Sequence, residues 1–339
     1  MTQQTGGVTT RLGVVAPRME YRAVESGREL PDDVLFAVQF GRDDAPGPAR
    51  GVARGVRVRL EPLSGAGLAE FWYANGAVRA GTAGAIRFAA DDHHLAAVLE
   101  VPEHEHGGLQ AATAHAYAQL ARFQSQSGYP HLLRTWNYLD AINCGADDAE
   151  RYRVFCTGRA TGLQSLRVER APAATVIGHH ATTGLLQLYW LAGRAPGIAI
   201  ENPRQTAPHH YPRQYGPTPP SFSRAMLVAP DLLMVSGTAS IVGHASRHPG
   251  SVQRQMDEIF ENLELLMARA HAHAPALSAQ TGSGTSIKAY LRHREDLAVV
   301  ERELARRLPA GTPFLVLAAD VCRSDLLLEF DCLHAAPAR

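Results

Sequence analysis

Short apolar runs separated by turn residues occupy the first hundred residues of the chain. Pairs such as Asp-Asp, Pro-Gly, Ser-Gly and Asn-Gly lie between the runs. Apolar runs bounded by such pairs are typical of β-strands. The pattern therefore predicts sheet structure, with strands at Leu12–Ala16, Val34–Phe40, Val56–Leu60, Phe71–Ala74, Ile86–Ala90 and His94–Val101.

Helical spacing of apolar residues replaces this pattern between residues 109 and 158. Leu109–Gln126 places Ala, Leu and aromatic residues three and four positions apart and contains no Gly or Pro. A second helix is predicted at His131–Ile142, where large apolar residues share one face, and a third at Asp147–Gly158.

A second series of strands and helices begins near residue 174. Its longest helix is predicted at Val252–Ala270, with Ser251 as the N-cap. A further helix is predicted at Glu295–Leu308, and strands at Ala174–Ile177, Leu185–Ala192, Leu232–Ser236, Ile287–Leu291, Pro313–Leu317 and Leu326–Leu333. Strands followed by helices in both halves predict an α+β fold, with the helices packed on one face of a mixed sheet.

One long segment does not fit either pattern. Residues 196–221 are rich in Pro and contain several aromatic and arginine residues. Connections of this length in a compact domain are usually functional or disordered. We interpret this one as ordered, because its aromatic residues and arginines suit a packed segment.

Composition excludes some classes of partner. The 339 residues carry 33 basic and 33 acidic side chains, so the net charge is zero and no overall positive field attracts nucleic acid. Lys288 is the single lysine, and the other 32 basic residues are arginine. Codon bias explains most of this skew, but some arginines could bind carboxylates through two hydrogen bonds, as lysine cannot.

Targeting, membrane and metal signals are missing from the sequence. No apolar run reaches the roughly 20 residues of a membrane span, and the N-terminus lacks the features of a signal peptide. Four cysteines form no C-x-x-C pair, and the paired histidines lack the spacing of a helical zinc site. We therefore expect a cytoplasmic protein with free thiols, no metal and no membrane partner.

Several motifs resemble known proteins. The second half is similar to the RidA/YjgF family, through Leu-Met-Val-Ser-Gly-Thr-Ala-Ser at residues 233–240 and Asp-Val-Cys-Arg-Ser-Asp at 320–325. The longer blocks at residues 133–143, 150–159, 201–205, 211–225 and 236–244 resemble the chorismatase family. That resemblance implies two RidA/YjgF-like sandwich domains, which we assign to residues 1–160 and 161–339, in a monomer without a cofactor.

The resemblance also implies a reaction. Chorismatases remove the pyruvyl group of chorismate, a small dicarboxylate with an enol ether, and an acid must protonate the enol ether at its methylene carbon. Glu329 lies in the apolar run Leu-Leu-Leu-Glu-Phe, where burial would raise its pKa. An exposed Glu at a strand end is the alternative. The resemblance places the family's catalytic acid at Glu329.

The product depends on a second group of residues. Members of the family that form 3-hydroxybenzoate resemble this chain at Cys322, with a glycine in the strand opposite. Gly237 could be that glycine, in which case 3-hydroxybenzoate and pyruvate are the expected products. If Ala239 holds the position instead, hydrolysis to a dihydroxycyclohexadiene carboxylate gains support.

Cations and hydrogen-bond donors are needed for the substrate's carboxylates. The family-like blocks contain Arg159, Arg204, Arg213 and Arg224, with Tyr215 as a further donor. For each arginine a solvated surface position is the alternative. Two other functions stay open: a RidA-like imine or enamine deaminase, and a metabolite-binding protein without activity.

Overall fold

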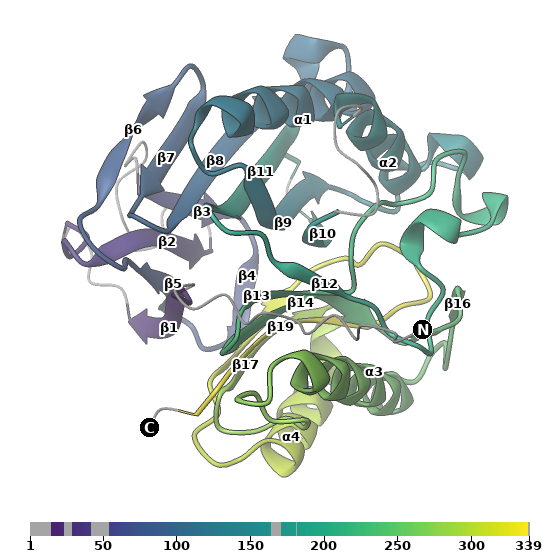
Figure 1. The fold of residues 1–339 in the computed structure, drawn as a ribbon. Helices are drawn as coiled ribbons and strands as arrows, with labels where there is room; N and C mark the ends of the chain where they lie inside the picture. The colour runs from purple at the N-terminus through teal and green to yellow at the C-terminus, as the bar shows by residue number, and fades with distance from the viewer. Residues whose placement is uncertain (1–14, 24–28, 42–53, 164–170, 181, 338–339) are drawn as a thin grey trace, which may run out of the picture.

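The computed structural model describes residues 15–23, 29–41, 54–163, 171–180 and 182–337. The described part of the chain forms two large sheets, one smaller sheet and a two-stranded hairpin (Figure 1). The smaller sheet has the order β1-β5-β2-β3, made of β1 (Arg18–Ala23), β2 (Val34–Phe40), β3 (Gly55–Val58) and β5 (Leu68–Tyr73). The hairpin pairs β15 (Ile241–Val242) with β16 (Ala245–Ser246).

Each large sheet combines strands that lie far apart in the sequence. The six-stranded sheet has the order β10-β9-β11-β8-β7-β6, made of β6 (Arg79–Ala83), β7 (Ile86–Ala90), β8 (His94–Pro102), β9 (His131–Asp140), β10 (Ala173–His179) and β11 (Leu185–Gly193). The seven-stranded sheet has the order β12-β13-β14-β19-β17-β18-β4, made of β4 (Glu61–Ser64), β12 (Ile198–Ile200), β13 (Ala225–Ala229), β14 (Leu232–Ala239), β17 (Thr285–Leu291), β18 (Phe314–Ala318) and β19 (Leu328–Ala335).

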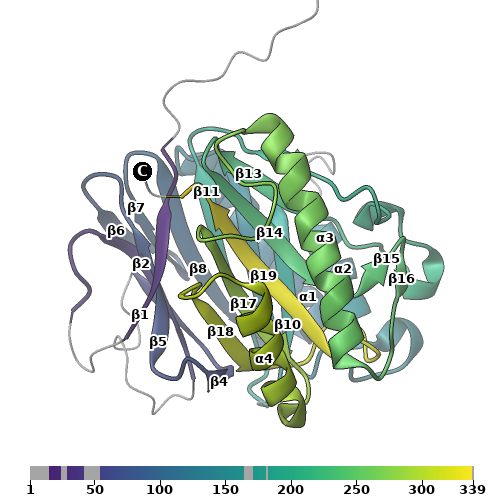
Figure 2. The ribbon, with the colours of Figure 1, turned by 90° about the horizontal axis from the view of Figure 1, so that it is seen from below.

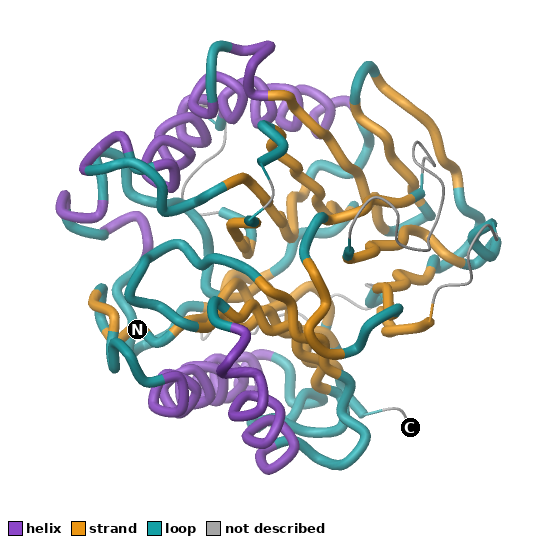
Figure 3. Tube along the Cα trace, turned by 180° about the vertical axis from the view of Figure 1, so that it is seen from behind, coloured by secondary structure: helices purple, strands orange, loops and turns teal. Residues whose placement is uncertain are grey.

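Helices cover the outer faces of the two large sheets. One pair, α1 (Leu109–Gln126) and α2 (Arg151–Gly162), shares an apolar core with the six-stranded sheet. The other pair, α3 (Val252–His273) and α4 (Leu297–Arg307), covers the seven-stranded sheet (Figure 2). The pairs lie on opposite sides of the molecule with the strands between them (Figure 3). The predicted α+β class, with helices on one face of each sheet, is confirmed.

A third apolar core lies between the sheets. Trp136 and Tyr138 of β9 pack there with Met234 of β14 and Tyr290 of β17, together with residues of the smaller sheet. The faces of the two large sheets that the helices do not cover pack against this core. Burial of this apolar surface away from water holds the layers together.

The predicted helix at His131–Ile142 is wrong: His131–Asp140 is strand β9. This strand lies between β10 and β11, and nearly all of its residues are buried. A strand buried on both faces carries apolar side chains at odd and even positions alike, so its pattern resembles that of a helix.

The other predicted elements agree with the structure within a few residues. Ser251 caps α3, and its side chain accepts a hydrogen bond from the backbone N–H of Arg254. The strand predicted at Leu12–Ala16 is an exception: residues 12–14 lie outside the described residues, Val15 and Ala16 are not in a strand, and β1 begins at Arg18. Strands from both sides of residue 160 form the six-stranded sheet, and the domain division at that residue stays a prediction.

The single lysine is a core residue. Nζ of Lys288 lies 2.5 Å from Oε1 of Glu70 and 3.6 Å from Oδ2 of Asp331, and all three side chains are buried. Asp331 also pairs with Arg134, whose Nη2 lies 3.0 Å from Oδ1. Two acids and two bases thus balance each other between the sheets, as buried charges require.

Of the helices in the described ranges, none is long and apolar enough to cross a membrane. No group of three or more His, Cys, Asp or Glu side chains is placed to hold a metal ion among the residues whose positions are described.

Candidate active site

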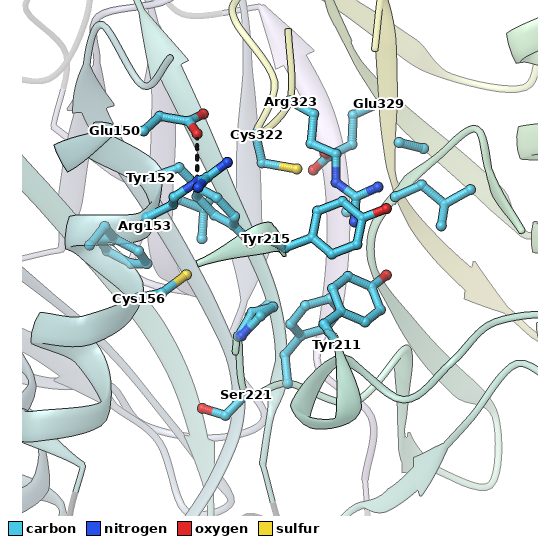
Figure 4. A pocket seen from close by; sticks show the side chains of 18 of the residues that line it. Glu150, Tyr152, Arg153, Cys156, Tyr211, Tyr215, Ser221, Cys322, Arg323 and Glu329 are labelled. Carbon is cyan, nitrogen blue, oxygen red and sulfur yellow. Dashed lines mark hydrogen bonds and ion pairs between the residues drawn. The ribbon is translucent and has the colours of Figure 1, made fainter. Parts of the chain in front are cut away.

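A cavity of about 430 Å³ lies where the two halves of the molecule meet (Figure 4). Its walls come from α2, β10, β14 and β19, from the end of the Pro-rich segment and the residue after it (211–222), and from the loop at 322–325. The segment 196–221, predicted to be ordered, is described throughout and supplies part of the wall. This volume and mixed lining are typical of sites for small molecules.

Glu329 lies on β19 and lines the cavity, with 5% of its surface exposed. Burial raises the pKa of Glu329 to about 8, and the negative charge of Asp331 adds to this rise. The positive charges of Arg134 and Arg224 oppose it. The carboxyl group is therefore mostly protonated at neutral pH, and it can donate a proton.

Asp331, two residues along the same strand, has the opposite character. Burial alone would raise its pKa, but the charges of Arg134 and Lys288 and a hydrogen bond from Trp136 outweigh this effect and lower the pKa. The environments of Glu329 and Asp331 thus separate their protonation states: one carboxyl group is neutral and the other is ionised.

Gly237 lies directly beneath the carboxyl group of Glu329. A Cβ atom at residue 237 would lie 2.8 Å from Cδ of Glu329, and nearer still to Oε1. Ala239 lies two residues along β14, pairs with Glu329 in the sheet and also lines the cavity. The structure brings the two alternative residues, Gly237 and Ala239, to the same wall, but only Gly237 occupies a place where a side chain would displace Glu329.

Two thiols face the cavity. Burial raises the pKa of Cys322 to about 12, with a further contribution from the charge of Glu329. Burial likewise raises the pKa of Cys156, on α2, to about 12. Both groups are therefore neutral at physiological pH and do not act as thiolates.

Arg159 and Arg224 line the cavity, and each has at least one buried N–H group without a hydrogen-bond partner in the described part of the chain. Both side chains are about 5% exposed or less. Nη1 of Arg159 donates to Ser221, and Nη2 of Arg224 donates to the hydroxyl of Tyr211 at 2.7 Å. Within the described residues, Nε and Nη2 of Arg159 and Nε of Arg224 have no hydrogen-bond partner. Buried donors without partners are costly, so these N–H groups suit a carboxylate ligand.

Arg204 and Arg213 do not line the cavity. Arg204 pairs with Glu258 at 2.7 Å and with Glu261 at 2.9 Å, both on α3. Arg213 pairs with Asp148 at 2.5 Å, and both of these side chains are exposed. These two arginines hold the Pro-rich segment against its neighbours.

Tyr215 lines the cavity together with an arginine that sequence reasoning missed. The guanidinium of Arg323 lies 3.9 Å from the ring centroid of Tyr215 and donates to the backbone carbonyl of His244. Arg323 follows Cys322 directly, so its place in the same motif could have indicated it. Tyr152 and Cys156 of α2 were also missed, because an amphipathic helix does not reveal which polar residues face a ligand.

Comparisons with known proteins agree with one another. Residues 70–192 match the family model "Chorismatase FkbO/Hyg5-like, N-terminal". The chain is 38% identical to a chorismatase of Streptomyces rapamycinicus, over 94% of this chain and 98% of that protein. It is 36% identical to a 3-hydroxybenzoate synthase of Streptomyces hygroscopicus, over 78% and 80% of the two chains. A crystal structure of a chorismatase, 33% identical, superposes with a TM-score of 0.82 over 96% of this chain and all of that one.

Proposed function

The chain belongs to the chorismatase family, and we propose that it converts chorismate to pyruvate and 3-hydroxybenzoate in the cavity around Glu329. One observation carries the proposal. A carboxyl group with its pKa raised to about 8 lines a cavity whose wall also includes two buried arginines with unpaired N–H groups. This combination supplies an acid and a binding site for a dicarboxylate in one place.

The first step is a proton transfer. Glu329 donates its proton to the methylene carbon of the enol ether, which becomes the methyl group of pyruvate, and positive charge develops at the ether carbon. A positioned acid typically accelerates such a step about 10²–10⁴-fold. The ionised Asp331 and the newly formed Glu329 carboxylate both favour this positive charge.

Pyruvate leaves in the second step, and the ring then becomes aromatic. The neighbouring hydroxyl of the ring attacks the ring carbon that carries the ether, the bond from that carbon to the ether oxygen breaks, and the hydroxyl proton returns to Glu329. The resulting arene oxide opens and aromatises to 3-hydroxybenzoate, so no water is consumed. In the alternative, one water molecule is added and a dihydroxycyclohexadiene carboxylate leaves with pyruvate.

Arg159 and Arg224 hold the substrate's carboxylates. Both side chains line the cavity and have a buried N–H group without a partner among the described residues, and a guanidinium can bind a carboxylate through two hydrogen bonds. Tyr215 and Arg323 add a hydroxyl and a further cation to the cavity wall. The net charge of the chain is zero, so the attraction for a dianion is local to this wall.

Cys322 favours the aromatic product. Its neutral thiol lines the cavity with Glu329 and occupies space that a water molecule would otherwise fill. Excluding water from the cation favours attack by the substrate's own hydroxyl. Gly237 and Ala239 line the same wall, and the position that selects the product is one of these two.

The test is to incubate the purified protein with chorismate and to identify the products by chromatography and mass spectrometry. We expect pyruvate and 3-hydroxybenzoate in equal amounts. Formation of pyruvate with the dihydroxycyclohexadiene carboxylate would show that 3-hydroxybenzoate is the wrong product, while chorismate would still be the substrate. Unchanged chorismate, with turnover of an imine derived from an amino acid, would overturn the proposal.

A further inference from the structure

The strand beneath Glu329 is irregular. β14 and β19 pair in register up to Val235 opposite Cys332, and again from Thr238 opposite Phe330. Between these points Ser236 and Gly237 both oppose Asp331, so β14 forms a β-bulge. A bulge removes backbone groups from the ladder, and their hydrogen bonds must then go elsewhere.

Three contacts of the bulge come from the six-stranded sheet, while the N–H of Ser236 donates to the carbonyl of Arg224. The backbone N–H of Gly237 donates to Oγ1 of Thr175 on β10, at 3.0 Å. The carbonyl of Val235 accepts from Nη2 of Arg134 on β9, at 3.2 Å. The hydroxyl of Ser236 accepts from the N–H of Ala174 at 2.8 Å. The bulge is therefore held from the opposite half of the molecule, across the sheet interface.

Thr175 is the centre of these contacts. Its hydroxyl accepts from Gly237 and from Nη2 of Arg134, at 2.5 Å, and donates to Oδ2 of Asp331, at 3.4 Å. A hydroxyl has one proton to donate and two lone pairs to accept with, so all of its hydrogen-bonding capacity is used. The side chain is 1% exposed.

These contacts lead directly to the acid. The carboxyl group of Glu329 lies against Gly237, whose backbone Thr175 holds. Arg134 and Asp331, the other two partners of the Thr175 hydroxyl, are charged groups that act on Glu329. The hydroxyl of Thr175 thus contacts both the Gly237 backbone, on which the Glu329 carboxyl group lies, and the Arg134–Asp331 ion pair.

We propose that Thr175 is a positioning residue for Glu329: its hydroxyl holds the bulge at Gly237 and the Arg134–Asp331 pair in the arrangement that sets the place of the Glu329 carboxyl group. Thr175 acts through Gly237 and not on the substrate. The kinetic consequence rests on the proposed function. The expected change in the position of the Glu329 carboxyl group does not rest on the proposed function.

Substitution of Thr175 by Val tests this role. Valine keeps the branched shape and removes the hydroxyl, so the N–H of Gly237 loses its acceptor and the bulge is free to shift. A misplacement of about 1 Å can cost about 100-fold in rate. We expect kcat for chorismate to fall at least about tenfold while KM changes less than about threefold. Thr175→Ser, which restores the hydroxyl, should recover kcat to within about threefold of the wild type.

The chain offers a matched control in Thr285. This threonine is also 1% exposed on a strand, and its Oγ1 accepts a hydrogen bond from a glycine N–H, that of Gly282, at 3.0 Å. It lies on β17 at the end of the β17–β19 pair remote from Glu329, where it contacts His334. Thr285→Val should leave kcat unchanged. An equal loss in both variants would show a general effect of removing a buried hydroxyl and would overturn the proposal.

A second measurement does not depend on turnover. The infrared band of the protonated Glu329 carboxyl group can be assigned by its loss in Glu329→Gln. We expect this band to shift in Thr175→Val and to keep its position in Thr175→Ser and Thr285→Val.

If the wild type leaves chorismate unchanged, the proposed function fails, and the position of the infrared band alone then tests the role of Thr175. If the wild type is active and Thr175→Val matches it in rate and band position, the role of Thr175 fails alone. Should Thr175→Val not fold, Thr175→Cys, with its weaker acceptor, replaces it with the same expected outcomes.

Discussion

The carboxyl group of Glu329 lies on the bare backbone of Gly237, in space that any side chain at residue 237 would fill. This contact relates two predicted site residues through packing. It gives Gly237 a role in placing the acid, whether or not it also selects the product.

Gly237→Ala should therefore impair catalysis. Its methyl group would displace the Glu329 carboxyl group, and we expect kcat for chorismate to fall about 10- to 100-fold. Ala239→Gly is the matched control, since Ala239 lines the same wall and changes by the same methyl group. The control should retain its rate, although its product ratio can change. A wild-type rate in Gly237→Ala would show that catalysis does not require the Glu329 carboxyl group to lie against residue 237.

The protonation of Glu329 predicts a pH dependence of stability. Its pKa is raised to about 8 in the folded protein, against 4.5 as the ordinary value. As pH rises from 4.5 towards 8, the unfolded chain releases this proton while the folded protein keeps it, so the unfolded state gains stability. We expect the wild type to lose stability relative to Glu329→Gln over this interval, as measured by urea unfolding at several pH values. A constant difference between the two proteins would mean that the pKa of Glu329 is not raised.

Cys322 and Cys156 form a second matched pair. Both line the cavity and both have a pKa of about 12, but only for Cys322 does the charge of Glu329 contribute to the shift. Cys322→Ala opens space for water near the acid, and we expect the product to move from 3-hydroxybenzoate towards the dihydroxycyclohexadiene carboxylate. Cys156→Ala should leave the product ratio unaltered. Mass spectrometry of both reaction mixtures decides, and equal ratios in both variants would remove Cys322 from product selection.

The arginines separate into two groups with different expected effects. Arg159→Met removes unpaired donors from the cavity, and hydrogen bonds to charged groups contribute about 1.5–3 kcal/mol, so KM for chorismate should rise at least about tenfold. Arg213→Met breaks an exposed ion pair with Asp148, and KM should stay within about twofold. Steady-state kinetics compare the two. A larger rise in KM for Arg213→Met than for Arg159→Met would contradict the proposal that Arg159 binds the substrate.

Local pattern predicted most of the fold. Short apolar runs bounded by turn residues predicted most strands, a regular apolar period predicted helices such as α3, and the bounds agree within a few residues. The prediction for β9 was wrong because this strand is buried on both sides and its large apolar residues Leu132, Trp136 and Leu139 fall at helical spacing. The buried Arg134 and Thr175 on neighbouring strands were missed for a related reason: their partners lie on other strands, and sequence alone does not bring these together.

The candidate site was predicted in part. Glu329, Cys322, Arg159, Arg224, Tyr215, Gly237 and Ala239 all line the cavity. Arg204 and Arg213 lie in the same sequence blocks but pair with acids outside it, and only the folded segment shows which way each side chain points. Lys288, notable in the composition as the single lysine, is a partner of buried acids and not a surface cation. The cytoplasmic location and the monomeric state stay predictions.

The central claim is that Glu329 supplies the proton that releases pyruvate from chorismate. The rate of pyruvate release by the wild type and by Glu329→Gln tests it most directly, with chorismate binding to the variant measured by calorimetry. Gln keeps the size of the side chain and cannot act as the acid, so we predict a rate at least about 100-fold lower with chorismate still bound. Pyruvate release by Glu329→Gln at the wild-type rate would contradict the claim.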